Sequence, residues 1–259
     1  MQLPILNFTI ETLLVIFTFM NLVFLISLII KRNDIADIAW GVGFLTVSLY
    51  WLFRSGMFLQ TQIIISFLVF TWAARLSLYI FLRNKGKSED FRYKEWKDKW
   101  QGSKILQSYL KVFLLQGFFM FLISLPVTLY NSFNGNLWMI TFFGLIVWVI
   151  GFIIETISDL QVYFFKKDSK NKGKILKSGL WKYSRHPNYF GEVLIWWGIW
   201  ILTLGSQYYL VSVIGPLTIT YLITKVSGIP LLEKRYENDK EYQEYAKKTS
   251  IFIPWFQKK

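Results

Sequence analysis

The stretch Leu6–Ile30, which reads LNFTIETLLVIFTFMNLVFLISLII, is a long apolar block with Glu11 as its single charged residue. A helix that crosses the hydrocarbon core of a bilayer needs about 20 predominantly apolar residues. The block is too long for the apolar region of a secretory signal peptide, and no basic segment precedes it. We therefore interpret it as a first membrane-spanning helix.

Six further apolar blocks of similar character follow along the chain. They are Ala36–Phe53, Met57–Leu82, Ile105–Tyr130, Leu137–Ser158, Tyr189–Leu204 and Tyr208–Ile229. Only 17% of the 259 residues are charged, whereas soluble domains usually contain about 25%. The sequence therefore predicts an all-α integral membrane protein with seven transmembrane helices.

Basic residues alternate between the connections that join these blocks. Residues 83–104 and 166–187 contain eight Lys and Arg each, and the tail from Lys234 contains seven. The connections 131–136 and 205–207 contain none. Because cytoplasmic loops carry an excess of Lys and Arg, we expect the N-terminus outside and the C-terminus in the cytosol. This distribution also accounts for the net charge of +13.

The chain contains no linker rich in Pro, Gly or Ser, so we expect a single transmembrane domain over residues 1–259. It has no cysteine and one histidine, His186. Disulfides, thiolate metal sites and multi-histidine metal sites are therefore excluded, and we predict no metal.

Ionisable residues within membrane spans are costly and are usually functional. Under the predicted topology, six of these residues lie in the cytosolic half of the membrane: Asp37, Arg75, Glu155, Asp159, Glu192 and Lys225. A spacing of four residues places two side chains on one helix face, as in the pairs Arg75 and Tyr79, Glu155 and Asp159, and Asn188 and Glu192. We expect these faces to line one chamber open to the cytosol. The alternative is that Arg75 pairs with a carboxylate to hold helices together.

The segment Lys166–Glu192, KKDSKNKGKILKSGLWKYSRHPNYFGE, is a basic loop that ends at a helix start. Pro187 suits the first helical turn, and Ser184 is a candidate N-cap. Helix N-termini bind phosphate groups, and the loop's lysines add positive charge. Asn188 offers a donor and an acceptor, and Glu192 an acceptor, for a carboxamide such as that of nicotinamide. The alternative is a solvated loop in which Asn188 has no special role.

A soluble-type dinucleotide fold is not indicated. Gly41-Val-Gly43 is the nearest approach to a glycine-rich fingerprint, and it lies inside an apolar block without a strand–turn–helix context. Any nucleotide must therefore bind between helices. Trp40 and Trp72 lie near the predicted chamber and are candidates for lining a pocket for a flat lipophilic substrate, although most tryptophans of membrane proteins are interface anchors.

Several motifs together resemble a known group of membrane enzymes. They are ADIAWG (Ala36–Gly41), RLSLY (Arg75–Tyr79), GKSEDFRY (Gly86–Tyr93), SRHPNYFGE (Ser184–Glu192), SGIPLLEK (Ser227–Lys234) and FIPW (Phe252–Trp255). Over residues 34–255 the chain is similar to the bacterial and plant branch (DUF1295) of the steroid 5-alpha-reductase-like superfamily, which is related to sterol reductases. Isoprenylcysteine carboxyl methyltransferases, which bind S-adenosylmethionine, carry a similar RHP-x-Y-x-G motif.

The resemblance implies that NADPH binds in a cytosol-facing cavity built mainly from a C-terminal half, residues 105–259. The family's cofactor-binding positions fall here on Asp159, Asn188 and Glu192, with the last two contacting the nicotinamide amide. Lys174 matches a basic residue near the adenosine phosphates, where the steroid enzymes have Arg. We also assign Arg185 and Tyr189 of the same motif to the cofactor site.

The chain also departs from the family pattern. Four residues before the aspartate of the Ser-Asp pair, here Asp159, the steroid enzymes have an Asn and this chain has Glu155. Trp72 stands where the steroid enzymes have a ketone-binding Tyr. Asp37 matches that tyrosine's glutamate partner only loosely. Cofactor binding is therefore better supported than reduction of a steroid.

The function we expect is that of an NADPH-dependent oxidoreductase acting on the C=C bond of a conjugated carbonyl in a lipophilic substrate. Asp37, held neutral by apolar surroundings, or Tyr79 would polarise the carbonyl and donate a proton. Trp40, Trp72 and Arg75 would line the substrate pocket. The alternatives are an S-adenosylmethionine-dependent membrane methyltransferase and a non-enzymatic membrane protein. Expected partners are a lipophilic substrate and membrane lipids, and no nucleic acid.

Overall fold

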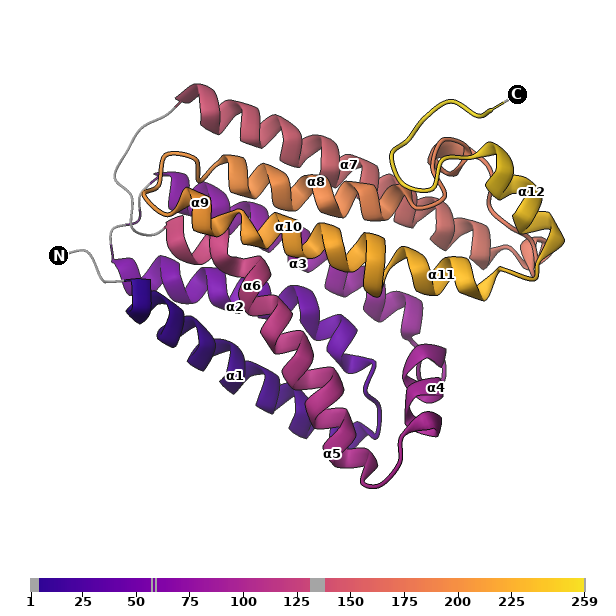
Figure 1. The fold of residues 1–259 in the computed structure, drawn as a ribbon, viewed down its shortest axis with the longest axis horizontal. Helices are drawn as coiled ribbons and strands as arrows, with labels where there is room; N and C mark the ends of the chain where they lie inside the picture. The colour runs from indigo at the N-terminus through magenta and orange to yellow at the C-terminus, as the bar shows by residue number, and fades with distance from the viewer. Residues whose placement is uncertain (1–4, 57, 59, 131–137, 259) are drawn as a thin grey trace. The chain divides into compact units, whose positions relative to one another are not determined.

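The structure, a computed structural model, describes residues 5–56, 58, 60–130 and 138–258 (Figure 1). Within these residues the chain forms helices and connecting turns, with one isolated β-bridge between Ser184 and Ser250 and no strand. The all-helical prediction is confirmed. The chain divides into two compact units, the first from residues 1–137 with 203–215 and the second from residues 138–202 with 216–259.

The first unit is built on three long apolar helices, α1 (Ile5–Ile30), α2 (Ile35–Ser55) and α3 (Gln60–Asn84). Helix α2 packs along α3, and α1 packs on α2 and on α6 (Leu115–Tyr130). The π-helical turn η1 (Tyr109–Leu114) joins α6 to the short helix α5 (Lys104–Ser108). The polar helix α4 (Phe91–Lys99) and the single turn α9 (Tyr209–Ser212) complete the unit.

The second unit is built on α7 (Trp138–Lys167) and α8 (Pro187–Ile201). The 3₁₀ turns η2 (Ser169–Asn171) and η3 (Gly179–Lys182) connect them. The remaining elements are α10 (Ile214–Tyr221), whose first two residues belong to the first unit, the π-helical turn η4 (Leu222–Val226), α11 (Ile229–Arg235) and α12 (Lys240–Lys248).

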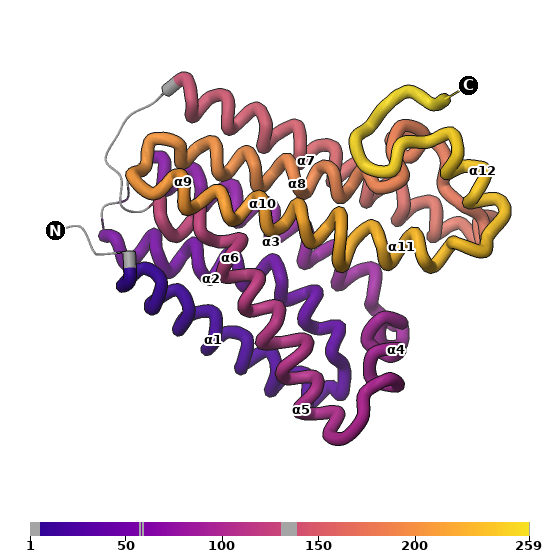
Figure 2. Tube along the Cα trace, viewed as in Figure 1, coloured from indigo at the N-terminus to yellow at the C-terminus, as the bar shows by residue number. Residues whose placement is uncertain are grey.

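Glycines let α7 and α8 approach each other closely, and the two helices run side by side in Figure 2. A Cβ atom on Gly191 would lie 2.6 Å from the backbone nitrogen of Glu155 and 2.6 Å from the carbonyl oxygen of Gly151. Gly144 and Gly198 make an equally close contact further along. Small residues at a membrane helix interface allow backbones to touch in this way. The contact fixes the polar end of α7 beside the start of α8.

Among the described residues, six helical segments are long and apolar enough to cross a membrane: Leu6–Ile30, Ile35–Ser55, Gln60–Asn84, Lys104–Tyr130, Met139–Lys167 and Tyr209–Arg235. The other predicted span, Tyr189–Leu204, corresponds to α8. This helix has 15 residues, which gives a length of about 22 Å at about 1.5 Å per residue. Seven spans are therefore not confirmed, and the orientation of the termini stays a prediction.

Two local expectations differ from the structure. Helix α7 continues beyond Ser158 to Lys167, because the polar residues after Ser158 still suit a helix outside an apolar environment. His186 is the N-cap of α8, while the Ser184 hydroxyl accepts a hydrogen bond from the His186 amide. Residues 105–130 belong to the first compact unit, and the cofactor-binding half over residues 105–259 stays a prediction.

Candidate functional site

Polar side chains of α7 and α8 meet where the two helices are in close contact. The Asn188 side-chain amide donates a hydrogen bond to Asp159 over 3.3 Å. Asp159 and Glu155 are buried, with 5% and 2% of their surface exposed, whereas Asn188 and Glu192 are partly exposed. The structure therefore brings Asp159 and Asn188 together, and their role in a cofactor site stays a prediction. The side-chain carbonyl oxygen of Asn188 accepts no hydrogen bond from the described residues.

A second polar cluster surrounds the base of α8 and is centred on Glu233 of α11. His186 Nε2 lies 2.8 Å from one carboxylate oxygen of Glu233, and the Tyr242 hydroxyl donates to the same oxygen over 2.5 Å. Arg185 donates to the other oxygen over 2.5 Å. The carboxylate thus gathers three side chains, and the charge of Arg185 is balanced within the second unit.

A pocket of about 420 Å³ opens beside this cluster. Burial, together with the adjacent Glu233 carboxylate, raises the pKa of Tyr242 well above its usual value. Tyr242 therefore remains a neutral hydrogen-bond donor at physiological pH. The pocket mixes both signs of charge and is lined by Arg185, Glu233, Lys234, Glu237, Tyr242, Gln243 and Ala246.

Helix α12 and the chain after it brace the residues that lead into α8. The Tyr245 hydroxyl donates to the carbonyl oxygen of Trp181 and lies 3.3 Å from that of Ser184. The Ser184 hydroxyl donates to the carbonyl oxygen of Phe252 over 2.7 Å. Tyr189, one turn into α8, stacks on the His186 ring with 5.8 Å between centroids. The start of α8 is thus held from two sides.

The basic loop before α8 is solvent-exposed at the positions expected to bind phosphate. Lys170, Lys172 and Lys174 are exposed. Lys177 forms an ion pair with Glu241 of α12 over 2.7 Å. The loop can therefore present positive charge to an anion from the first three lysines, while Lys177 also links the loop to α12.

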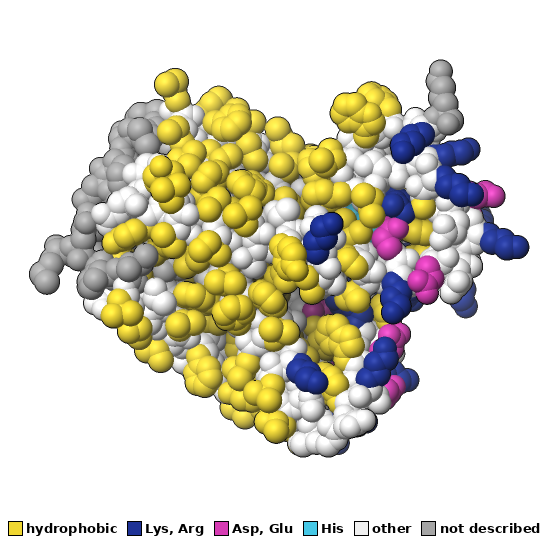
Figure 3. All heavy atoms as spheres, in the orientation of Figure 1, with side chains coloured by type: hydrophobic (Ala, Val, Ile, Leu, Met, Phe, Trp, Pro, Cys, Tyr) yellow, Lys and Arg dark blue, Asp and Glu magenta, His cyan; other side chains and the backbone are white. Residues whose placement is uncertain are grey.

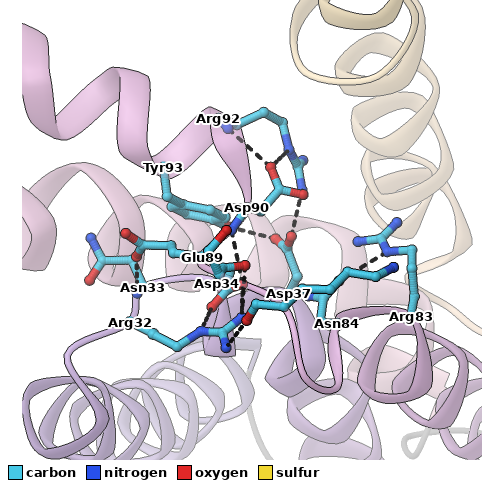
Figure 4. A network of polar contacts seen from close by, with 12 residues as sticks. Arg32, Asn33, Asp34, Asp37, Arg83, Asn84, Glu89, Asp90, Arg92 and Tyr93 are labelled. Atoms are coloured by element: carbon cyan, nitrogen blue, oxygen red, sulfur yellow. Dashed lines mark hydrogen bonds and ion pairs between the residues drawn. The ribbon is translucent and has the colours of Figure 1, made fainter. Parts of the chain in front are cut away.

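In the first unit, Asp37 is engaged by helix α4, as Figure 4 shows. Arg92 contacts one oxygen of its carboxylate at 2.6 Å, and the Tyr93 hydroxyl donates to the other over 2.5 Å. Asp37 therefore has a counter-charge and a hydrogen-bond donor beside it and does not lie in wholly apolar surroundings. Its role as a proton donor stays a prediction.

The same network joins the start of α2 to the loop before α4, because the Asn33 amide donates to Glu89 over 2.6 Å and the Asp90 amide donates to Asp34 over 3.1 Å. Each of these carboxylates also has a local cation: Arg32 pairs with Asp34 at 2.7 Å, Lys97 with Glu89 at 2.7 Å, and Arg92 with Asp90 at 3.0 Å. Burial alone would lower the pKa of Arg92, but the carboxylates of Asp37 and Asp90 outweigh it and raise the pKa. Burial, reinforced by the nearby carboxylate, raises the pKa of Tyr93 well above its usual value. The cluster is therefore a set of charge pairs with a neutral tyrosine.

The predicted substrate-pocket residues occupy different environments within the first unit. Trp72 is fully buried and packs edge-to-face on Phe44, with 5.6 Å between ring centroids, so it is a core residue there. Trp40 also packs on Phe44 and is partly exposed, as are Arg75 and Tyr79 of α3. The predicted chamber would combine residues of both units and stays a prediction.

Two groups of polar residues were not singled out from the sequence. Glu233 and Tyr242 lie within or near the motif SGIPLLEK, but the motif was read only as a family resemblance. Arg92 and Tyr93 end the motif GKSEDFRY, which follows the third span. Glu233 lies four residues beyond the last apolar block, Tyr208–Ile229, so the rule that ionisable residues within membrane spans are usually functional did not single it out.

The part of the chain that the structure describes holds no group of three or more His, Asp or Glu side chains that could bind a metal ion. Gly41 and Gly43, the pair nearest to a glycine-rich nucleotide fingerprint, instead allow close helix packing. A Cβ atom on Gly41 would lie 2.9 Å from the Ser77 hydroxyl, and one on Gly43 would lie 2.3 Å from the Met120 side chain.

Comparison with known families gives one match that covers most of the chain. The sequence profile of a family described as "Protein of unknown function (DUF1295)" matches residues 23–249. The match includes both the α7–α8 polar face and the Asp37 network. No solved structure matches the chain.

Curated proteins match over shorter regions. The chain is 27% identical over 112 residues to 3-oxo-5-alpha-steroid 4-dehydrogenase 1 of Rattus norvegicus and 29% identical over 112 residues to that of Bos taurus, covering 43% of this chain and 40% of each relative. It is 34% identical over 70 residues to the probable O-methyltransferase ustE of Ustilaginoidea virens, covering 27% and 24% of the two chains. The matches thus span less than half the length of these relatives.

Proposed function

We propose, from the premise that this chain belongs to the DUF1295 family, that it is a membrane-embedded reductase. Its similarity to the 3-oxo-5-alpha-steroid 4-dehydrogenases supports an oxidoreductase in general. The finer proposal is that it uses NADPH to reduce a C=C bond conjugated to a carbonyl group in a lipophilic substrate. The contact between Asn188 and Asp159 is the observation that carries the proposal.

The residues around this contact fit the nicotinamide carboxamide. Such a group has an N–H donor and a carbonyl acceptor. The Asn188 carbonyl oxygen is available to accept from the amide, while its own N–H group donates to Asp159 over 3.3 Å. Glu192 lies one helical turn further along and supplies a second acceptor. Lys174, exposed in the basic loop, would approach the adenosine phosphates.

When bound, NADPH would supply the hydride for the carbon β to the carbonyl group, and a protein group at the carbonyl oxygen would polarise the C=C bond. The α carbon then takes a proton, so that the product gains two hydrogens across the former double bond. We assign the polarising and proton-donating role to Tyr79, because the Asp37 carboxylate is already engaged by Arg92 and Tyr93. Arg75 on the same face of α3 would orient the substrate, with Trp40 beside it.

A second candidate function is transfer of a methyl group from S-adenosylmethionine to a lipid or prenylated substrate. The match to a probable O-methyltransferase favours this alternative. In the reductase proposal the Asn188 amide faces the carboxamide of the cofactor. In the methyltransferase alternative no carboxamide is present, and Asn188 and Glu192 would have no such role.

A binding experiment on the purified protein tests the two candidates together. We expect NADPH to bind, NADH to bind more weakly and S-adenosylmethionine not to bind. Lys174→Glu should weaken NADPH about two- to fivefold more than NADH, as expected for an exposed charge contact of up to about 1 kcal/mol. Lys94→Glu in α4 makes the same change in net charge and serves as the control. Binding of S-adenosylmethionine without NADPH would establish the methyltransferase instead.

The proposed site faces the cytosol, because the basic loop before α8 lies on the side that the positive-inside rule assigns to the cytosol. The cysteine-free chain makes the test direct. Lys172→Cys should react with a membrane-impermeant thiol reagent only after the cells are permeabilised. Labelling in intact cells would reverse the orientation.

A further inference from the structure

We propose that the segment Ile251–Lys258 after α12, here the C-terminal loop, binds the anionic phospholipid headgroups of the membrane that holds this protein. The proposal concerns a surface of the second unit outside the cofactor site. It does not depend on which cofactor the protein uses.

The backbone of the C-terminal loop is fixed, and Figure 2 shows this part of the chain turning back over the segment that precedes α8. The ends of the loop are joined, since the amide of Lys258 donates to the carbonyl oxygen of Lys248 over 3.0 Å. Three further hydrogen bonds hold it: Arg185 amide to Ser250 carbonyl at 2.8 Å, Trp255 amide to Tyr183 carbonyl at 2.9 Å, and Ser184 hydroxyl to Phe252 carbonyl at 2.7 Å.

This fixed loop leaves large apolar side chains largely exposed, although the Phe256 ring lies edge-on to Tyr183 with 6.1 Å between centroids. Ile253 is 58% exposed, Trp255 is 70% exposed and Phe256 is 76% exposed. A flexible tail could bury such side chains against itself, but this backbone is tied at several points. Contiguous exposed apolar side chains mark a surface that contacts a partner or a membrane, and tryptophan is enriched at the boundary between lipid and water.

Basic residues accompany these apolar side chains. Residues 245–259 contain four lysines and no acidic residue. Lys247, Lys248 and Lys258 are exposed, and so is Lys182 in the segment to which the loop is hydrogen-bonded. Figure 3 shows hydrophobic side chains over the C-terminal segment with Lys and Arg side chains beside them.

Exposed apolar side chains next to lysines favour a lipid surface over a protein as the partner of this loop. Lysine is depleted in protein–protein interfaces, whereas lysines next to apolar anchors attract anionic headgroups and hold a segment at the membrane surface. The loop is also part of a chain with several membrane-spanning helices, so a bilayer is always close to it. Aromatic side chains would enter the headgroup layer, and the lysines would contact lipid phosphates.

The test uses a fluorescent label that reports on lipid contact. Phe256→Cys, labelled with an environment-sensitive dye, is reconstituted in phosphatidylcholine vesicles that carry spin-labelled acyl chains, with and without phosphatidylglycerol. Glu244→Cys, at an exposed position of α12, is the matched control. We expect the dye at position 256 to show blue-shifted emission and severalfold stronger quenching than the dye at position 244. The quenching at position 256 should increase further when the vesicles contain phosphatidylglycerol.

A variant with Lys247→Gln, Lys248→Gln and Lys258→Gln should lose the increase that phosphatidylglycerol produces. Ile253→Cys provides a second label position if the first variant does not reconstitute. Water-like emission at both loop positions in both kinds of vesicle would overturn the proposal and leave a protein partner as the explanation of the apolar surface. Equal quenching in neutral and anionic vesicles would overturn the role of the headgroup charge.

Discussion

Two polar clusters of this protein use similar side chains in different ways. In the Asp37 network of the first unit, carboxylates contact guanidinium and ammonium groups at 2.6 to 3.0 Å. At the α7–α8 contact of the second unit, the Asn188 amide reaches Asp159 over 3.3 Å. The first arrangement is a set of short charge pairs, whereas the second is one long amide contact with an acceptor oxygen to spare.

This difference teaches how to separate a structural cluster from a binding site. Charge pairs that satisfy one another stabilise the fold when both partners are present, and removing one partner is costly. A polar group with unused hydrogen-bonding capacity can accept a ligand with little rearrangement. We therefore expect changes in the Asp37 network to act on stability, and changes at Asn188 to act on cofactor affinity.

The largest effect is expected from Arg92→Ala. This change leaves Asp37 and Asp90 without their shared guanidinium and should lower the free energy of unfolding by about 2–4 kcal/mol, somewhat below the value for a fully buried pair because Arg92 is partly exposed. Thermal unfolding in detergent measures it. Lys94→Ala, at an exposed position of the same helix, should change stability little. A stable Arg92→Ala protein with weakened NADPH binding would reverse the assignment of the two clusters.

Asn188→Ala and Glu192→Gln should act in the opposite manner. Glu192→Gln removes the charge of an acceptor whose hydrogen bond to the cofactor amide is worth about 1.5–3 kcal/mol, so NADPH affinity should fall about ten- to a hundredfold. Asn188→Ala removes a neutral hydrogen bond worth about 0.5–1.5 kcal/mol, so affinity should fall about two- to tenfold. The melting temperature of Asn188→Ala should change little, because its hydrogen bond to Asp159 is long, at 3.3 Å. Asn84→Ala in the first unit is the matched control. Normal affinity in well-folded variants would remove the main support for the reductase site.

Gly191→Ala tests whether the α7–α8 contact positions the site. The added methyl group would meet backbone atoms of Glu155 and Gly151 at 2.6 Å, and such overpacking costs about 1–3 kcal/mol. Gly117→Ala makes the same change on α6, where the nearest atoms are Met20 and Ile16 side-chain atoms at 3.3 and 3.4 Å. We expect loss of stability and of NADPH affinity together for Gly191→Ala and neither for Gly117→Ala. Unchanged affinity would separate the site from the helix contact.

The smallest effect concerns alkaline pH and the brace around α8. Burial raises the pKa of Tyr245 above its usual value of 10.0. A group whose pKa is raised by folding stabilises the protein below its unfolded pKa, and this contribution is lost as the pH rises toward the folded pKa. The free energy of unfolding should fall by about 1 kcal/mol between about pH 10 and 11 from this group.

Tyr245→Phe should remove that part of the pH dependence while lowering stability at neutral pH. Denaturant unfolding of the parent protein and of Tyr245→Phe is compared at about pH 10 and about pH 11. The difference isolates the contribution of Tyr245, because the lysines titrate in both proteins. Tyr93→Phe gives the corresponding measurement in the Asp37 network. An identical alkaline decline in the parent protein and in Tyr245→Phe would contradict the buried, neutral state of this tyrosine.

Part of this organisation could be predicted from residue order because it depends on local pattern. Apolar blocks of about 20 residues require helices in a membrane, so the bounds of α1, α2 and α3 differ little from the predicted spans. The spacing of four residues placed Glu155 with Asp159 and Asn188 with Glu192 on helix faces. The spacing of residues along one helix does not show which residue of another helix each of them contacts. Asp37 was expected in apolar surroundings, yet Arg92, 55 positions later, supplies its counter-charge.

What the sequence by itself determined is the helical membrane character, the alternating basic connections and the motif that starts at Ser184. These follow from hydropathy, charge and local chain geometry, which need only neighbouring residues. Only the tertiary structure decided that α8 is a short helix held against α7 by glycines, that Glu233 gathers Arg185, His186 and Tyr242, and that the C-terminal loop is tied to residues 183–185. Each of these depends on contacts between distant segments, and the free energy of such contacts depends on packing and distance, which residue order alone does not specify.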